Sequence, residues 1–167
     1  MAVQDEYKDM TWKMKYSAEM QSQQHQQLIN LLNNHKFTDV TFIIGENDDR
    51  FDINRLFLCM LSEKFDTFIS NNDDLKTDTI VIKDIDSKAF ECLIKFAYAN
   101  DPELTTQTAL QTLKICKKYG ISSLIKLCKK YVTRNLCGDN VCYLLNKSVE
   151  LELDQQAAEC LQYFKDN

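Results

Sequence analysis

Three short segments that read as β-strands constrain the fold of this chain most strongly, because everything around them reads as helix. The three segments are residues 38–44, 51–54 and 79–83. In the first, Val40, Phe42 and Ile44 alternate with other side chains, which is typical of a strand with one buried face. Three short strands cannot enclose a core without helices that cover them. The sequence therefore predicts an α+β fold that is mostly helical.

Helical spacing of apolar residues flanks these strands on both sides. Leu28, Leu31 and Leu32 fall on one stripe of a helix predicted over residues 24–34, and Ile29 widens that stripe. Residues 56–61 form an unbroken apolar run that we interpret as a buried helix. The predicted helix starts after Asp84 are Asp86 or Ser87, Thr105 or Thr106, Ser122 or Ser123, Asp139 and Asp154, and the predicted ends are Gly120 and Gly138.

Composition excludes several classes of protein. The 167 residues fit one domain, or one domain with a fragment of a second, and the net charge of -5 argues against bulk attraction to nucleic acid or anionic membrane. No stretch approaches eighteen apolar residues, and the first twenty residues lack the apolar region of a secretory signal. Seven irregularly spaced cysteines without a CxxC pair indicate free thiols in a reducing compartment. We expect a cytoplasmic or nuclear protein.

Residues suited to catalysis, cofactor binding or metal binding are few. The sequence has no glycine-rich phosphate loop, and Gly120-Ile121-Ser122 begins like a nucleophile elbow but has Leu124 where the second glycine is required. The two histidines, His25 and His35, lie in or beside the N-terminal helix. We therefore predict a protein that is not an enzyme and has no cofactor and no metal site. A cysteine nucleophile stays as the enzymatic alternative.

Two further patterns leave alternatives open. The pieces Ile115–Tyr119 and Leu127–Tyr131 repeat a Cys-Lys-Lys-Tyr motif, which fits either nucleic-acid contact or the solvated lysines of two antiparallel helices; the acidic net charge favours the second. The stripe Leu28/Leu31/Leu32 either packs on its own domain or forms a self-association face, because a helix that precedes a compact unit can cross to a twin.

Residues 37–45, FTDVTFIIG, resemble the opening strand of the BTB/POZ domain. The likeness continues through residues 51–68, 80–82, 89–98 and 112–128, and residues 139–166 look like the start of the BACK region that follows BTB in adaptor proteins. The resemblance implies a tail or helix extension over 1–23, a BTB/POZ domain over 24–136 and the start of a BACK region over 137–167. It also implies a small three-stranded sheet covered by helices, an N-terminal dimerisation helix and a C-terminal helical extension.

Membership of this family would imply a homodimer that recruits other proteins. The implied dimer-interface residues are Leu28, Ile29, Leu31, Leu32, Asp39 and Arg55. Many BTB–BACK members are substrate adaptors for cullin-3 ubiquitin ligases. The implied cullin-binding residues are Phe65, Phe68, Ile69, Leu75 and Thr77. The expected partners are the chain itself, cullin-3 and substrate or scaffold proteins.

The sequence departs from the family pattern at two places. The family histidine falls on Asn54, which can still form side-chain hydrogen bonds. Cullin-binding members often carry an apolar-x-Glu motif in the loop after the helix that bears Phe68, whereas this loop reads Leu75-Lys76-Thr77 and lacks the acid. The alternative is therefore a BTB dimeriser that acts as a scaffold or transcriptional co-regulator without binding cullin.

Overall fold

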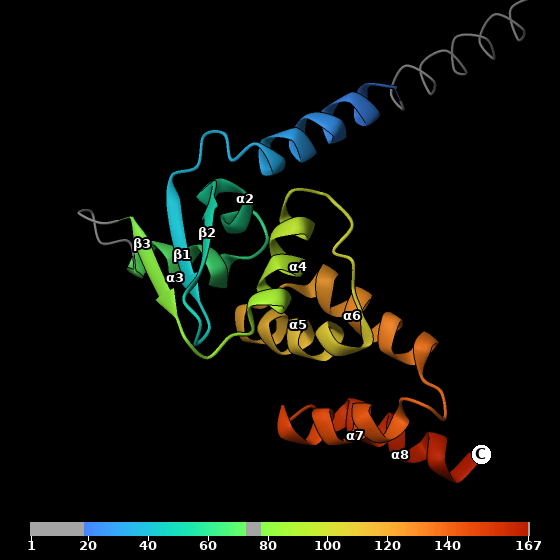
Figure 1. Ribbon diagram of the computed structural model, residues 1–167. Helices are drawn as coiled ribbons and strands as arrows, with labels where there is room; N and C mark the ends of the chain where they lie inside the picture. The colour runs from blue at the N-terminus through green and yellow to red at the C-terminus, as the bar shows by residue number, and fades with distance from the viewer. Residues whose placement is uncertain (1–18, 73–77, 167) are drawn as a thin grey trace, which may run out of the picture.

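A three-stranded mixed sheet forms one side of the body in the computed structural model, which describes residues 19–72 and 78–166 (Figure 1). The strands are β1 (Val40–Ile44), β2 (Asp49–Ile53) and β3 (Thr79–Ile82), in the order β2-β1-β3. β1 pairs antiparallel with β2 and parallel with β3, so that Phe42 lies opposite Phe51 on one side and Ile80 on the other. The predicted α+β class and the three-stranded sheet are confirmed.

The buried face of the sheet is the one that alternation predicted. Val40, Phe42 and Ile44 are all buried, and the Phe42 ring lies 5.2 Å from the ring of Phe90 on the helix that covers the sheet. Removal of these apolar side chains from water supplies the main driving force for docking the helices on the strands. The core is thus continuous from β1 into the helical part of the body.

Five helices complete this body. They are α2 (Arg55–Cys59), α3 (Glu63–Asn72), α4 (Ser87–Ala97), α5 (Thr106–Tyr119) and α6 (Ser122–Asn135). Asp86 caps α4 by accepting from the Ala89 amide at 2.9 Å, and Thr105 forms a reciprocal capping box with Thr108 at the start of α5. Gly120 ends α5 in a left-handed conformation, as predicted.

The structure corrects three details of the predicted helices. Residues 56–61 do not form a buried helix: Leu58 of α2 is buried, but Leu56 and Met60 are 59% and 73% exposed. A helix of five residues can present only one face to the core, so its other apolar residues face outward. Gly138 does not end α6, which stops at Asn135, and the N-cap of α7 is Asn140 rather than Asp139.

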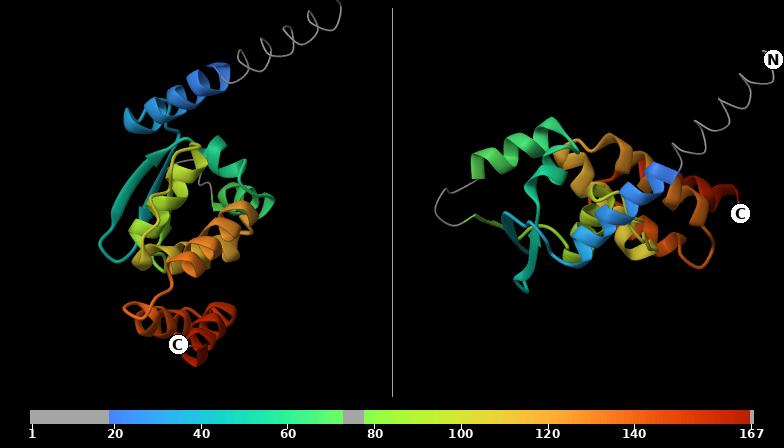
Figure 2. Two further views of the ribbon diagram at one scale, coloured as in Figure 1. Left: turned by 90° about the vertical axis from the view of Figure 1, so that its right-hand side faces the viewer. Right: turned by 90° about the horizontal axis from the view of Figure 1, so that it is seen from above.

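Two antiparallel helices, α7 (Val141–Glu150) and α8 (Asp154–Asp166), lie as a separate layer beneath the body (Figure 2). Side chains of α6 hold α8 in place: Lys129 donates to the Gln155 side chain at 2.6 Å and Thr133 to Glu159 at 3.2 Å. At the other end, residues 19–33 form a helix that projects from the body, with its C-terminal part near the start of β1. None of the helices within residues 19–72 and 78–166 combines the length and the hydrophobicity that a membrane span requires.

Candidate protein-interaction surfaces

The N-terminal helix, residues 19–33, is attached to the body only through its last turns. Residues 19–27 are exposed, whereas Leu28, Ile29, Leu31 and Leu32 are half-buried, and Leu31 and Leu32 pack against the core. The apolar stripe therefore divides: its end packs on its own domain, while Leu28 and Ile29, one turn earlier, stay partly open to solvent. Packing on its own domain is thus seen for Leu31 and Leu32, and self-association through Leu28 and Ile29 stays a prediction.

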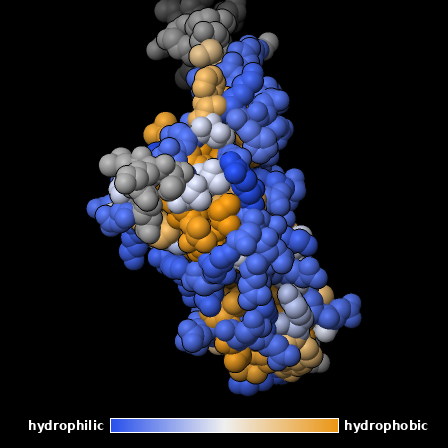
Figure 3. Space-filling view, turned by 60° about the vertical axis from the view of Figure 1, so that its left-hand side comes forward, coloured by the Kyte–Doolittle hydropathy of each residue, from blue (hydrophilic) through white to orange (hydrophobic). Residues whose placement is uncertain are grey.

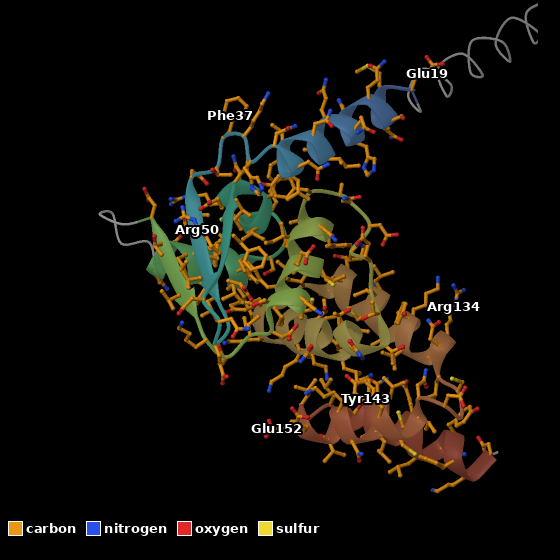
Figure 4. All side chains as sticks on the ribbon, viewed as in Figure 1. Glu19, Phe37, Arg50, Arg134, Tyr143 and Glu152 are labelled. Atoms are coloured by element: carbon orange, nitrogen blue, oxygen red, sulfur yellow. The ribbon has the colours of Figure 1, made fainter. Side chains whose placement is uncertain are left out.

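A second apolar surface, which the sequence reasoning missed, lies where the turn after the N-terminal helix meets the start of α2. It consists of Phe37, Leu56 and Met60, which are 78%, 59% and 73% exposed, and we call it the α2 apolar surface. Leu56 and Met60 share one side of α2 at i, i+4, and the Asn54 side chain ties the Phe37 carbonyl to the start of this helix at 3.0 Å. Figure 4 shows Phe37 on the turn that follows the N-terminal helix. The i, i+4 spacing opposite Leu58 was the signal that could have revealed this surface.

Asp39 and Arg55 meet at the start of α2. The Asp39 carboxylate accepts from the Arg55 backbone amide at 2.7 Å and lies 3.3 Å from the Arg55 Nε, and the guanidinium also reaches Asp78 at 3.2 Å. Arg55 is only 28% exposed, so this charged pair is partly shielded from water. Its contacts within one chain hold the start of α2 against β1 and the start of β3.

Asn54 stands at the centre of the same region. Its side-chain oxygen caps α2 by accepting from the Leu56 backbone amide at 3.1 Å, and the Asn54 backbone amide donates to the Tyr98 hydroxyl at 2.9 Å. Tyr98 is buried, and that burial raises the pKa of its hydroxyl. The predicted ability of Asn54 to form side-chain hydrogen bonds is confirmed by these contacts.

The helix predicted to bind cullin, α3, is anchored tightly on α5. Phe65 and Ile69 are 0% and 2% exposed, and the rings of Phe65 and Phe68 lie 4.5 and 5.0 Å from the Tyr119 ring. Phe65 and Ile69 thus position the helix, whereas the half-buried Phe68 retains some open surface. Leu75 and Thr77, the other two predicted residues, lie outside the described residues.

The α7–α8 layer carries a third apolar surface. Its exposed members are Tyr143, Val149, Leu161 and Phe164. Figure 3 shows apolar side chains gathered over these lower helices on the face that it displays. Apolar side chains exposed on a small domain are typical of a contact with another protein segment when they gather on one face.

Between this layer and the body lies a polar cleft of about 720 Å³. Its walls come from the β1–β2 turn, the loop before α4, α5 and α7. Lys83, which lines the cleft, pairs with Asp48, and Lys147 of α7 pairs with Glu150 at 2.7 Å. These two lysines of the cleft are thus each paired with a carboxylate. Within the described part of the chain, no three His, Cys, Asp or Glu side chains are placed to hold a metal ion.

Four of the seven cysteines are poorly suited to act as nucleophiles. Burial raises the pKa of Cys59 to about 11 and also raises those of Cys92 and Cys160. A contact with Cys128, together with burial, raises the pKa of Cys116. Because the thiolate is the reactive form, these four side chains are held in the unreactive one. Their environments give no support to the cysteine-enzyme alternative.

Comparison with known proteins agrees with this picture of an interaction domain. Residues 28–136 match the sequence model of the BTB/POZ domain. The chain is 30% identical over 132 residues to BTB/POZ domain-containing protein 6-A of Danio rerio and 27% identical over 132 residues to BTB/POZ domain-containing protein 3 of Homo sapiens. Each alignment covers 78% of this chain, but only 24% and 25% of those proteins, so the chain spans about a quarter of the length of these relatives.

A solved structure shows the same fold. The BTB domain of zebrafish PATZ1 superposes with a TM-score of 0.54 at 22% identity, over 73% of this chain and 95% of that one. The likeness supports the arrangement of a small sheet covered by helices.

Proposed function

The chain belongs to the BTB/POZ family, whose domains are non-catalytic protein-interaction modules that commonly dimerise, and we propose that it acts as a homodimeric adaptor. The proposal assigns dimerisation to the N-terminal helix and α2, and recruitment of other proteins to α3 and the α7–α8 layer. The observation that carries it is the α2 apolar surface beside the half-buried Leu28 and Ile29.

The dimer interface in this proposal joins the N-terminal helix to α2 of the other copy. Leu28 and Ile29 supply one half of the apolar contact, and the α2 apolar surface supplies the other. A twofold axis between two such ends would bury both halves twice, which is how a modest patch on one copy becomes a stable interface. Obligate interfaces of this type bury roughly 2,000 Å² or more. Asp39 and Arg55 contribute to the interface indirectly, because their contacts fix the position of α2.

For the recruited partner we propose the N-terminal region of cullin-3, which would make the chain a ubiquitin-ligase adaptor. The sequence resemblance supports this assignment, and so does the rigid seating of α3, since a preorganised helix loses little entropy on binding. Phe68 of α3 and the α7–α8 layer, which we interpret as the start of a BACK region within residues 137–167, form the contact. The competing function is a scaffold or transcriptional co-regulator, and Thr77, in the place of the usual glutamate, favours it.

Light scattering after size-exclusion chromatography tests both parts. The chain alone is expected at twice its mass of 19.5 kDa, and a mixture with a cullin-3 N-terminal fragment is expected to contain two fragments per dimer. A monomer would overturn the dimer. A dimer that fails to bind the fragment at about ten micromolar, where interfaces of standard size still associate, would leave the scaffold function as the better assignment.

A further inference from the structure

The positive charge of this acidic chain is concentrated in its central helical hairpin. Residues 106–135, which include α5 and α6, contain seven cationic residues and no acid, whereas the whole chain has a net charge of -5. The rest of the chain therefore carries a net charge of -12. Such a division of charge creates a local positive potential in a molecule that is otherwise negative.

Within this hairpin, three cations form a continuous row on the outer side of α6. Lys126, Lys130 and Arg134 follow one another at intervals of four residues and are all exposed. The residues that bury the helix, Leu124, Cys128 and Val132, have the same spacing but precede the cations by two residues. Two residues correspond to about 200° around a helix, so the row faces directly away from the core. We call Lys126, Lys130 and Arg134 the α6 basic row.

The α6 basic row has no acidic partner among the described residues. Other lysines nearby are engaged: Lys118 pairs with Asp84 at 2.9 Å, and Lys129 donates to Gln155 at 2.6 Å. No ion pair or side-chain hydrogen bond joins Lys126, Lys130 or Arg134 to any described residue. Like charges at i, i+4 repel each other and weaken a helix unless an opposite charge lies between them. No acidic side chain among the described residues therefore offsets the repulsion between these three cations.

An apolar side chain accompanies the row. Leu127 is 37% exposed and lies three residues before Lys130 and seven before Arg134, on the same side of the helix. Cations that flank a partly exposed leucine match a ligand that carries acids around an apolar residue. From this combination we propose that α6 binds an acidic segment of a partner protein, with its carboxylates on the α6 basic row and an apolar side chain against Leu127.

The same features favour an acidic protein segment over nucleic acid. Binding of single strands commonly uses aromatic side chains for stacking, and the only aromatic residue of α6, Tyr131, is half-buried. A long polyanion would also meet the acidic remainder of the molecule, whereas a short acidic segment needs only the row. Figure 4 places Arg134 on α6 at a distance from Phe37 of the α2 apolar surface, so this site can be occupied in a dimer.

Fluorescence anisotropy tests the proposal with a labelled peptide of about four helical turns that combines glutamates with leucines at i, i+4. We expect salt-sensitive binding to the full chain. The variant Lys126→Gln/Lys130→Gln/Arg134→Gln is expected to bind about tenfold more weakly, because it removes three exposed charge contacts. These side chains are exposed, so the variant should keep the fold, and its circular dichroism spectrum verifies that.

A matched control removes the same charge elsewhere. The variant Lys36→Gln/Lys88→Gln/Lys165→Gln changes three exposed lysines outside α6 and should keep the wild-type affinity. An equal loss in both variants, or no binding to the unchanged chain, would overturn the proposal. Tighter binding of a DNA duplex that depends on the same row would also overturn it, since the occupant would then be nucleic acid. So would self-association of the chain alone that the α6 variant abolishes, since the occupant would then be a second copy.

Discussion

Asp39 and Arg55 are sixteen residues apart in sequence and bind each other through both main-chain and side-chain atoms. The Asp39 carboxylate accepts from the Arg55 amide at 2.7 Å, and the Arg55 guanidinium donates back to the Asp39 carbonyl at 2.9 Å. The pair therefore locks α2 to the first strand. Since α2 carries Leu56 and Met60, its position determines where the α2 apolar surface lies.

The variant Asp39→Ala tests this lock. Loss of the carboxylate removes the acceptor of the Arg55 backbone amide and one contact of the guanidinium, which keeps the Asp39 carbonyl and Asp78, so we expect the free energy of unfolding to fall by about 1–2 kcal/mol. Asp39→Asn should lose less, because its side-chain oxygen can still accept from the Arg55 amide. Urea unfolding measures both, with Asp49→Ala as a control at an exposed aspartate of the same sheet. Equal losses for Asn and Ala would mean that the charge, and not the hydrogen bond, stabilises the contact.

Gly120 offers a test of the turn between α5 and α6. Its φ of +73° is in the left-handed region, and a Cβ there would lie 3.3 Å from the Lys64 side chain, which can move aside. Backbone strain should therefore dominate, and Gly120→Ala should lower the free energy of unfolding by about 1 kcal/mol. Gly138→Ala is the matched control, since nothing lies within 4 Å of its added Cβ. Thermal unfolding measures both variants, and a fall in melting temperature for Gly138→Ala as large as that for Gly120→Ala would contradict this prediction.

Much of the fold could be predicted because local chemistry decides it. Alternation identified the buried face of β1, pairs of neighbouring cap residues that included Asp86 and Thr105 marked two helix starts, and Gly120 marked a helix end. Each of these signals acts within a few residues, so the sequence displays it directly.

The candidate sites were harder to predict because they depend on distant contacts. Leu56 and Met60 belong to an apolar run, and only the docking of α2 against Tyr98 and the sheet decides which of its side chains face outward. The same difficulty applies to α3. Phe65 and Ile69 form an apolar helix face that suits either a core or a partner, and their burial against α5 becomes visible only when Tyr119 is placed beside them.

The Cys59 thiol provides a prediction on pH. Burial and a contact with Asp66 raise its pKa from 9.0 to about 11, so the folded chain retains a proton between these values that the unfolded chain releases. The stability that this thiol contributes is therefore complete below pH 9 and is lost as the pH rises through about 11. In alkylation followed by mass spectrometry, Cys59 should react slowly until the pH approaches that value. The exposed Cys137 and Cys142 serve as internal references, and equally fast labelling of Cys59 at about pH 8 would contradict the raised pKa.

Substitution of the exposed residues of α2 tests the proposed dimer. Leu56→Glu/Met60→Glu places two carboxylates on the α2 apolar surface, where contact with a second copy would leave them desolvated and unpaired. Because both side chains are mostly exposed in the single chain, the variant should fold, with an unchanged circular dichroism spectrum and a mass near 19.5 kDa. Val149→Glu, at a 64% exposed residue of α7, is the control and should keep the dimer. A variant of α2 that remains dimeric would move the interface away from this surface, whereas dissociation by Val149→Glu would place it on the α7–α8 layer.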